Sequence, residues 1–361
     1  MNICFLLGGL HQNGGIGRVT AMLANDLSKD DRYRITLMCY SDPNLPNLYN
    51  LSSNIDQKYF LDSYSSMTQQ ILFGGVNRLR KYLKQNNIDI LIACGALFYP
   101  ISVLACRRIK TKCICWEHSN PKGNDDHRYQ YFARLFGIKR ADLNVVLTKQ
   151  ALNVYKSAYK VDNVVQIYNP VDDAVFAFSG EYKAESKRII SVGRLSYQKN
   201  FELAIEIASK VLPQNPEWNW DVYGKGEEEL KLRELIDAKG ISRQFHLCGQ
   251  VEDLYERYKN YSFMVMTSRY EGFPMSLLEG LGNSLPLLSF DIPTGPNEII
   301  DNGENGYIFE PFNVDLMANC INELMKNDNL LKKLSEAARR KADMFSQQEI
   351  TCSWKRILTQ I

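Results

Sequence analysis

Short apolar runs alternate with helical stretches along the whole chain, and this alternation constrains the fold more than any other feature. Six runs in the first half are predicted to be strands, at residues 3–7, 35–40, 88–93, 113–117, 143–147 and 164–167. Six more follow in the second half, at residues 188–192, 220–223, 245–248, 263–266, 285–290 and 307–309. Strands that alternate with helices form parallel sheets with crossover helices. The sequence therefore predicts an α/β fold of two doubly wound, Rossmann-like domains.

The boundary between the two series is predicted near Asn169-Pro170, a turn dipeptide that ends the first one. The first domain then covers residues 1–170, and the second begins at residue 171. In open parallel sheets, ligands bind outside the carboxyl ends of the strands. Two such sheets in tandem can turn these edges toward a common cleft, so the residues that follow each strand are the candidates for function.

The composition is typical of a soluble globular protein, with 361 residues of which 45% are hydrophobic and 23% charged. Nine cysteines are irregularly spaced and form no Cys-x-x-Cys pair, which favours reduced thiols and a cytoplasmic protein. The four histidines show no ligand spacing with them, so a metal site is not expected. The first residues are those of a buried strand rather than a leader peptide, and no stretch is long enough to span a bilayer.

Charge is distributed unevenly between the two halves. Residues 1–170 carry 21 basic and 12 acidic side chains, net +9, whereas residues 171–361 carry 22 basic and 29 acidic ones, net −7. A basic domain indicates a polyanionic partner such as a membrane surface, a phospholipid-like acceptor or a nucleic acid. A chance imbalance on solvated helix faces is the alternative.

Basic and aromatic residues mix in three segments of the first half, at residues 77–84, 107–112 and 128–140. Basic amphipathic helices of this kind bind anionic membrane surfaces, and ordinary solvation of a helix is the alternative. The segments contain no recognised nucleic-acid-binding module, so nucleic acid is not expected as a partner. The pattern predicts an anionic membrane surface as a partner.

The segment from Glu271 to Glu279 is the strongest candidate for a binding site. Pro274 suits the first position of a helix, because its missing N–H would be unpaired there anyway. The helix dipole and the next N–H groups would attract an anion such as phosphate, and these groups belong to Met275, Ser276 and Leu277. Glu279 lies roughly 7.5 Å further along the helix axis, and carboxylates accept hydrogen bonds from sugar hydroxyls. The spacing suggests a nucleotide-sugar, and an ordinary acidic first turn is the alternative.

Other predicted strand ends carry cations, glycines or a histidine. Arg194 and Lys199 follow the first strand of the second half, and two cations in a loop before a helix suit a diphosphate. Two solvent-exposed basic residues are the alternative. His118 ends a strand of the first half, where a lone histidine is usually structural. Further junctions, which could approach a ligand closely or could be plain turns, contain Gly15, Gly17, Gly193, Gly224, Gln250 and Val251.

Taken together in this order, these segments resemble the retaining glycosyltransferase family 4, whose fold is the two-domain GT-B fold. Glu271-x7-Glu279 resembles the paired-glutamate motif of the family, and Gly193-Arg194-Leu195 with Lys199-Asn200 resembles its phosphate-binding segment. Gly224-x-Gly226 approximates its glycine turn, and Asn305-Gly306-Tyr307 resembles its late Asn-Gly turn. Residues 167–172 resemble the motif at the domain junction, so the resemblance covers essentially the whole chain.

The resemblance implies a role for each candidate residue. Glu279 would bind the ribose hydroxyls and Glu271 the donor sugar, while Arg194 and Lys199 would neutralise the diphosphate. His118 would contact the donor sugar near the reacting carbon. The implied catalytic residues are thus His118, Arg194, Lys199 and Glu271, and no metal or other cofactor is implied. The implied donor-binding residues are Gly15, Gly17, Gly193, Gly224, Gln250, Val251, Phe273, Met275, Ser276, Leu277 and Glu279.

The resemblance also implies a different role for each domain. The N-terminal domain, residues 1–170, would bind the acceptor, and the domain at residues 171–346 would bind the nucleotide-sugar, with both facing a central cleft. A last helix, residues 347–361, would cross back to the N-terminal domain.

The expected activity is retaining transfer of a hexose or N-acetylhexosamine from a UDP-sugar to a hydroxyl, by a metal-independent hexosyltransferase. A lipid-linked oligosaccharide or similar glycan is the expected acceptor, in the synthesis of a bacterial surface polysaccharide such as O-antigen, capsule or lipopolysaccharide. The protein would be cytoplasmic and peripheral on the inner membrane. Two alternatives stay open: a transferase that acts on a soluble sugar acceptor, and a non-catalytic nucleotide-sugar-binding subunit.

Overall fold

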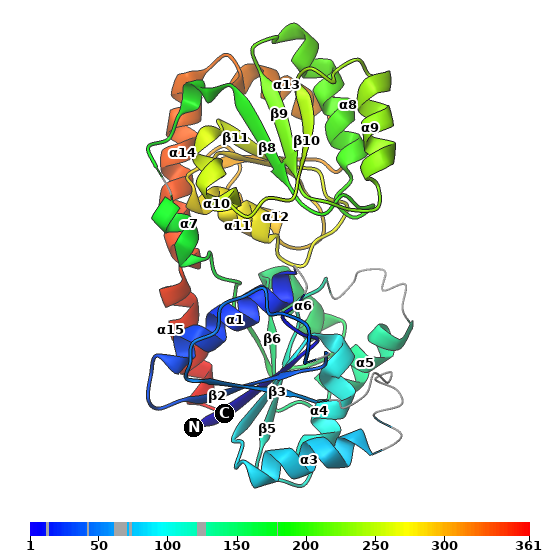
Figure 1. Cartoon of the computed structure of the whole chain (residues 1–361), viewed down its shortest axis with the longest axis vertical. Coiled ribbons are helices and arrows are strands. Elements are labelled where there is room, and N and C mark those ends of the chain that lie inside the picture. Colours follow the sequence, from blue (N-terminus) through cyan, green and yellow to red (C-terminus); the bar gives the residue numbers. More distant parts are fainter. Residues whose placement is uncertain (12–13, 42, 61–70, 72–73, 121–127, 179) are drawn as a thin grey trace. The chain divides into compact units, whose positions relative to one another are not determined.

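The chain forms two compact units, each built around one parallel sheet, in a computed structural model (Figure 1). The structure describes residues 1–11, 14–41, 43–60, 71, 74–120, 128–178 and 180–361. One unit comprises Met1–Asn169 together with Gln347–Ile361, and the other comprises Pro170–Ser346. The predicted α/β fold class is confirmed. Gln12 and Asn13 of the first predicted glycine loop lie outside the described residues.

The first unit contains a seven-stranded parallel sheet in the order β3-β2-β1-β4-β5-β6-β7. The strands are β1 (Asn2–Leu7), β2 (Arg34–Cys39), β3 (Ile55–Tyr59), β4 (Ile90–Cys94), β5 (Lys112–Trp116), β6 (Leu143–Val146) and β7 (Val164–Gln166). β4 is buried along its whole length and β1 along all but its first residue, because helices cover both faces of the sheet. The strand order reverses between β1 and β4, so the loops that follow these two strands diverge at that point.

The prediction of six strands in the first half was wrong, because the edge strand β3 was missed. Its sequence, Ile-Asp-Gln-Lys-Tyr, contains no apolar run, and only Ile55 is buried. It pairs with β2 alone, and Asp56 and Lys58 form an ion pair of 2.8 Å on its exposed side. An edge strand with charged side chains avoids pairing with other chains, but it gives a weak sequence signal.

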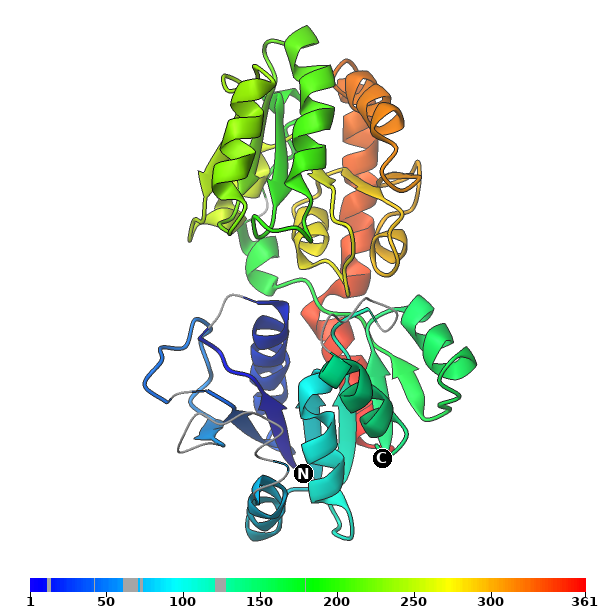
Figure 2. The same cartoon turned by 90° about the vertical axis from the view of Figure 1, so that its right-hand side faces the viewer.

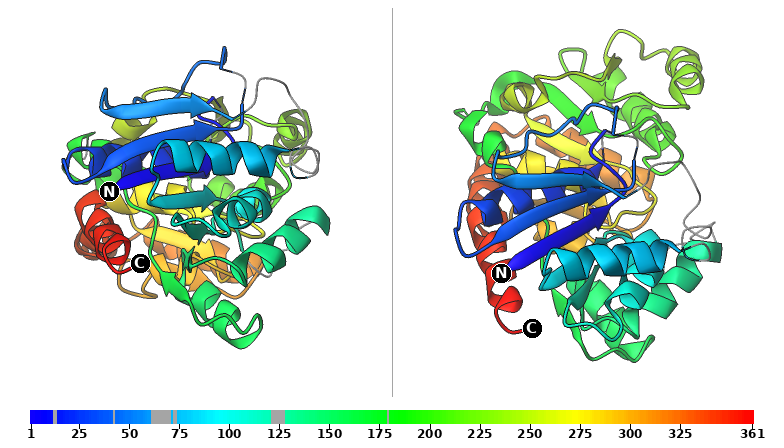
Figure 3. Two further views of the ribbon diagram at one scale, coloured as in Figure 1. Left: turned by 90° about the horizontal axis from the view of Figure 1, so that it is seen from below. Right: turned by 60° about the horizontal axis from the view of Figure 1, so that its bottom comes forward.

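Helices cover both faces of this sheet (Figure 3). The helices are α1 (Gly15–Ser28), α3 (Gly75–Gln85), α4 (Tyr99–Cys106), α5 (Arg128–Ile138), α6 (Lys149–Ser157) and α15 (Gln347–Leu358). Buried residues of α3, α4, α5 and α6 share one core cluster with Cys113 and Cys115 of β5. Trp116 alternates with these cysteines along the strand and packs on Trp354 of α15 on the opposite face, with 4.7 Å between the ring centroids.

The C-terminal helix α15 is anchored to α1 by polar contacts. Asp26 Oδ2 accepts hydrogen bonds from Gln347 Nε2 at 2.9 Å and from Thr351 Oγ1 at 3.2 Å. Lys355 Nζ lies 2.9 Å from Asp30 Oδ2, just after the end of α1. The end of the chain is therefore part of the first unit, although more than 300 residues separate these partners in the sequence.

The second unit contains a six-stranded parallel sheet in the order β10-β9-β8-β11-β12-β13. The strands are β8 (Arg188–Val192), β9 (Asn219–Tyr223), β10 (Phe245–Gly249), β11 (Phe263–Met266), β12 (Leu287–Phe290) and β13 (Gly306–Phe309). All six correspond to predicted strands. The order reverses between β8 and β11, which are hydrogen-bonded neighbours. The loops after β8 and β11 therefore leave the same edge of the sheet side by side, where open α/β sheets bind their ligands.

Two helical layers enclose this second sheet (Figure 2). One layer consists of α8 (Phe201–Val211), α9 (Glu229–Ala238) and α13 (Val314–Leu324), in which α8 contacts both of the others. The other consists of α7 (Asp173–Phe178), α10 (Leu254–Arg257), α11 (Met275–Gly282) and α14 (Asp328–Ala342), with the short α12 (Pro296–Ile299) against α11. Helix α11, which carries the predicted glutamate motif, is held between α7, α12 and α14.

Candidate functional site

The reversal of strand order in the second unit brings two predicted site residues into direct contact. Lys199 follows β8 and Glu271 follows β11, and Lys199 Nζ lies 2.6 Å from Glu271 Oε1. Both side chains are largely buried, at 18% and 8% exposure. Gln198 Nε2 also donates to the carbonyl oxygen of Tyr270 at 3.0 Å, which ties the two loops together. A cation and a carboxylate thus lie together in a largely buried position at the carboxyl edge of the sheet.

The loop after β8 is fixed against the loop after β9 by glycines that could not be replaced without a clash. A Cβ atom on Gly224 would lie 1.9 Å from the carbonyl oxygen of Gly193, and the φ of Gly224 is +148°. A Cβ on Gly226 would lie 2.2 Å from the carbonyl oxygen of Leu195. The N–H of Leu195 donates to the carbonyl of Lys225 at 3.0 Å. Gly224 and Gly226 therefore have a packing role, and for Gly224 this comes in addition to the predicted donor-binding one.

Arg194 is placed differently from Lys199. Its guanidinium lies 3.2 Å from Glu227 Oε2, and its side chain is 73% exposed. Exposed ion pairs contribute about 0–1 kcal/mol, so an anionic ligand could displace Glu227 at little cost. Arg194 and Lys199 both follow β8, at the same edge of the sheet, but each forms an ion pair with a different carboxylate.

Helix α11 begins at Met275, one residue later than predicted, because Pro274 is its N-cap residue with an extended ψ of 107°. The first intrahelical bond runs from the N–H of Leu278 to the carbonyl of Pro274 at 3.3 Å. Three N–H groups precede it and lack an intrahelical acceptor; they belong to the predicted residues Met275, Ser276 and Leu277. The start of the helix is thus a possible anion site of the predicted kind.

A tight turn after β12 holds the segment in front of α11 in place. Thr294 Oγ1 donates a hydrogen bond to the carbonyl oxygen of Glu271. Thr294 has a φ of +73°, which is unfavourable for a β-branched residue and persists only where surrounding contacts enforce it. A Cβ on Gly295 would lie 2.5 Å from Cδ of Pro274. Phe273 is buried against Phe345, with 5.8 Å between the ring centroids.

Glu279 lies one turn into α11 and is buried, as is Glu271. Its Oε2 atom accepts a hydrogen bond of 2.5 Å from the hydroxyl of Tyr258, which is itself fully buried. Carboxylates are rarely buried unless they are paired or hydrogen-bonded. The burial of both glutamates argues against an ordinary solvated acidic turn.

Gln250 and Val251 follow β10 at the same edge of the second sheet. The N–H of Gly224 donates to the carbonyl of Gly249 at 2.9 Å, so the ends of β9 and β10 are joined directly in front of these two residues. Gln250 is exposed and Val251 is half-buried. Their predicted role toward a nucleotide base stays a prediction.

In the first unit, Gly15 and Gly17 lie in the first turn of α1, whose N-cap is Gly14. Gly15 is exposed, whereas Gly17 is buried, with a Cβ position 3.2 Å from the carbonyl oxygen of Gly9. His118 follows β5 and packs against Trp116 in a tilted arrangement, with 4.3 Å between the ring centroids. Burial lowers the pKa of His118 to about 4, so the imidazole is neutral at physiological pH. Its Nε2 atom is buried and has no hydrogen-bond partner among the residues that the structure describes.

Sequence reasoning missed the buried ion pair that shapes the loop around His118. Arg134 Nε of α5 lies 2.7 Å from Glu117 Oε2, and both side chains are inaccessible to solvent. Glu117 Oε1 accepts hydrogen bonds from the N–H of Ser119 at 3.1 Å and from its hydroxyl at 2.7 Å, and Tyr155 donates to Oε2 at 3.2 Å. Interpreting residues 128–140 as a basic surface helix was therefore wrong for Arg134. The one sequence signal that could have indicated this ion pair is Glu117 itself, an acidic residue next to His118 at the end of a predicted strand.

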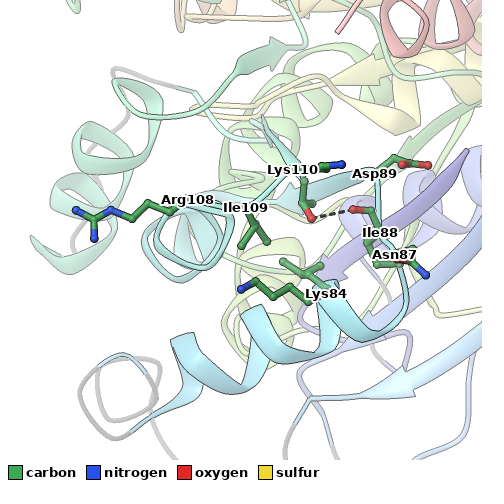
Figure 4. Close-up of a pocket in the computed structure, with 9 residues that line it drawn as sticks. Lys84, Asn87, Ile88, Asp89, Arg108, Ile109 and Lys110 are labelled. Atoms are coloured by element: carbon green, nitrogen blue, oxygen red, sulfur yellow. Dashed lines mark hydrogen bonds between the residues drawn. The ribbon is translucent and has the colours of Figure 1, made fainter.

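A pocket of about 330 Å³ lies elsewhere, where α3 and α4 end and β4 and β5 begin (Figure 4). Its lining does not include the predicted site residues: it consists of Leu83, Lys84, Asn87, Ile88, Asp89, Arg108, Ile109, Lys110 and Thr111. Cations beside helix C-termini stabilise the helix dipole, which accounts for the basic residues there. This is the amino edge of the first sheet, opposite to the edge at which such folds bind ligands.

The described residues contain neither a cluster suited to a metal ion nor a membrane-spanning helix. Within the described ranges, no group of three or more histidine, cysteine, aspartate or glutamate side chains could hold a metal ion. No helix in the part of the chain that the structure describes is long and apolar enough to cross a bilayer.

Comparison with known proteins identifies the family. Residues 13–175 match the model of Glycosyltransferase Family 4, and residues 174–341 match that of Glycosyl transferases group 1. An uncharacterized glycosyltransferase of Haemophilus influenzae is 25% identical over 99% of both chains. The amylovoran biosynthesis glycosyltransferase AmsD of Erwinia amylovora is 28% identical, also over 99% of both chains. The crystal structure of HepE from Anabaena in complex with UDP superposes with a TM-score of 0.84 at 16% identity and covers 100% of each chain.

The two family models match consecutive segments that correspond to the two sheets, and both relatives align from end to end. The solved structure shares the fold over the whole length of the chain. The chain therefore belongs to the family 4 type of glycosyltransferases, which have the GT-B fold.

Proposed function

We propose that this glycosyltransferase moves a hexose or N-acetylhexosamine from a UDP-sugar to a hydroxyl of a glycan acceptor, with retention of configuration and without a metal ion. The observation that carries the proposal is the Lys199–Glu271 pair at the strand-order reversal, directly before the start of α11. The UDP complex of HepE supports the choice of nucleotide, because that protein shares the fold. The name of AmsD supports a role in polysaccharide synthesis.

In this proposal the diphosphate binds at the start of α11. The three N–H groups without an intrahelical acceptor, the helix dipole, Lys199 and Arg194 together supply positive potential in the place of a metal. Glu279 accepts hydrogen bonds from the ribose hydroxyls, and Glu271 accepts them from the donor sugar. Gly224, Gln250 and Val251 contact the base, and Gly15 and Gly17 keep their predicted donor-binding role.

The reaction breaks the bond between the anomeric carbon and the diphosphate oxygen and forms one to the acceptor oxygen on the same face. The proton of the acceptor hydroxyl passes to the departing diphosphate. Preformed cations and dipoles stabilise the negative charge that grows on this leaving group, which is the main catalytic effect. His118, held neutral by burial, contacts the donor sugar near the reacting carbon as a hydrogen-bonding group.

A donor panel tests this function. The protein is incubated with UDP-glucose, UDP-N-acetylglucosamine, GDP-mannose and ADP-glucose, and nucleotide release is measured with and without EDTA. We expect slow release of UDP from a UDP-sugar and no effect of the chelator. Release from the GDP- or ADP-sugars alone would contradict the choice of donor, and loss of activity in EDTA would contradict metal independence. Tight binding of UDP without any release would favour the non-catalytic binding subunit.

The proposed acceptor is lipid-linked, which places the protein on an anionic cytoplasmic membrane surface. Arg78, Lys81 and Lys84 lie exposed on α3, and Tyr131 and Phe132 are 45% and 61% exposed on α5. Basic side chains attract anionic lipid, and exposed aromatic rings favour the interface between headgroups and acyl chains. A soluble sugar acceptor would require neither feature.

Co-sedimentation with vesicles tests this attachment. We expect binding to vesicles that contain phosphatidylglycerol and much weaker binding to pure phosphatidylcholine, with the difference decreasing at high salt. Replacing Tyr131 and Phe132 by serine should weaken binding. The matched control replaces Leu230 and Leu316, which are exposed on the other unit, by serine. Equal binding to both kinds of vesicle at low salt would contradict attachment through charge.

A further inference from the structure

The buried hydroxyl of Tyr258 is directed at one of the two predicted donor-binding glutamates. Tyr258 lies in a short 3-10 turn, Tyr258–Asn260, between α10 and β11, and its side chain is fully buried. Its hydroxyl donates to Glu279 Oε2 over 2.5 Å. This contact joins the segment in front of β11 to the helix that follows the same strand.

The two glutamates are held by different kinds of group. Glu271 is paired with a cation, Lys199, at 2.6 Å, whereas the carboxylate of Glu279 accepts from a neutral phenol. A short hydrogen bond to a carboxylate restricts the orientation of the carboxylate plane. A carboxylate that already has one orientation is a better acceptor for a pair of neighbouring hydroxyls than one that must be ordered on binding.

The backbone around Glu279 is ordered from the opposite side. Asn283 Nδ2 donates to the carbonyl oxygen of Glu279 at 3.1 Å, and the N–H of Asn283 caps the helix on the same carbonyl. Gly280, the next residue, packs so closely that an added Cβ would lie 2.9 Å from Sδ of Met264 in β11. The main chain of Glu279 is therefore fixed, and the orientation of its carboxylate depends on the contacts of the side chain.

We propose that Tyr258 is a positioning residue that sets the orientation of Glu279 toward the ribose hydroxyls and thereby makes the site select ribonucleotides over deoxyribonucleotides. This inference rests on the proposed function, in which Glu279 binds the ribose. The hydroxyl of Tyr258 acts through Glu279 and does not touch the ligand itself.

Calorimetric titration of UDP and of 2′-deoxy-UDP tests the proposal on the full chain. The wild type should bind UDP about tenfold or more tightly than 2′-deoxy-UDP, because a hydrogen bond to a charged group is lost with the 2′-hydroxyl. Tyr258→Phe keeps the buried ring and removes only the hydroxyl. It should bind UDP several-fold to tenfold more weakly and 2′-deoxy-UDP almost unchanged, so that the preference for ribose largely disappears.

Tyr182→Phe is the matched control. The hydroxyl of Tyr182 also donates a 2.5 Å hydrogen bond inside the second unit, but its acceptor is the carbonyl oxygen of Ser262. This variant should lower the melting temperature as Tyr258→Phe does and keep the wild-type preference for UDP. If the role of Tyr258 were purely structural, Tyr258→Phe would bind both nucleotides more weakly by the same factor. That result would overturn the inference.

The same titrations distinguish a failure of the proposed UDP site from a failure of the proposed role of Tyr258. If the wild type binds neither nucleotide, the proposed UDP site itself is wrong. If the wild type prefers UDP and Tyr258→Phe retains the full preference, the donor site stands and the role of Tyr258 is refuted.

Discussion

Replacing Lys199 by alanine is expected to lower the rate of UDP release and sugar transfer by about 10²–10³-fold while the protein stays folded. The Nζ atom of Lys199 lies at the strand-order reversal, in front of α11, where the leaving diphosphate is proposed to gain its negative charge. Its removal takes away a preformed cation and also leaves the buried carboxylate of Glu271 without the charge of Lys199. The binding of UDP should weaken less than the turnover falls, because the charge is greatest in the transition state.

Lys210→Ala provides the matched control for this experiment. Lys210 Nζ forms an ion pair of 2.9 Å with Asp315 in the same unit, but this pair is exposed and lies between α8 and α13. The variant should keep wild-type turnover, and its melting temperature should change by little, as for other exposed pairs. Turnover of Lys199→Ala within a few-fold of the wild type would remove Lys199 from the catalytic residues.

The pairing of Lys199 with Glu271 also shows where prediction from the sequence stopped. The strands could be predicted because β4 and β12 are buried and mostly apolar, and β8 has an apolar, buried centre. The contact between the two loops could not be predicted, because 72 residues separate Lys199 from Glu271 and only the order of the strands brings them together. The sequence suggested a phosphate ligand for Lys199 and a sugar for Glu271, and it contained no signal that the two side chains bind each other.

The same reason explains the misplacement of Arg134. A run of basic and aromatic residues in α5 predicts a surface helix, and Tyr131 and Phe132 are indeed exposed. The side of the helix on which a residue lies decides whether it is exposed. Arg134 faces inward and is fully buried. Its partner, Glu117, comes from the end of β5, so the pair becomes visible only when α5 is placed over the sheet.

Replacing Arg134 by methionine is expected to lower the free energy of unfolding by about 3–5 kcal/mol at neutral pH. Methionine fills most of the space, but it leaves the fully buried carboxylate of Glu117 without the charge that compensates its burial. Lys112→Met is the matched control in the same unit, because it removes a half-exposed pair of 3.1 Å with Asp142. That variant should lose less than about 1 kcal/mol. Urea unfolding followed by tryptophan fluorescence measures both.

The pH dependence of the stability of Arg134→Met distinguishes the loss of a buried charge from a packing defect. In the wild type, burial alone would raise the pKa of Glu117, but the charge of Arg134 and the hydrogen bonds from Ser119 outweigh it and hold the pKa below its usual range. The stability contributed by the pair is therefore present above the unfolded pKa, about 4.3, and is lost as the pH falls through the lower folded value. Without Arg134 burial dominates, so the pKa of Glu117 should rise and the carboxyl should become protonated at mildly acidic pH.

The deficit of Arg134→Met relative to the wild type should consequently be largest at pH 7–8 and smaller near pH 5. The double variant Glu117→Gln with Arg134→Met removes the buried charge altogether. It should regain a large part of the lost stability at pH 7.5 and show no such dependence on pH. A deficit that is the same at both pH values and is not reduced in the double variant would mean that Arg134 stabilises the unit through packing alone. In that case the ion pair would not be what fixes the loop that carries His118.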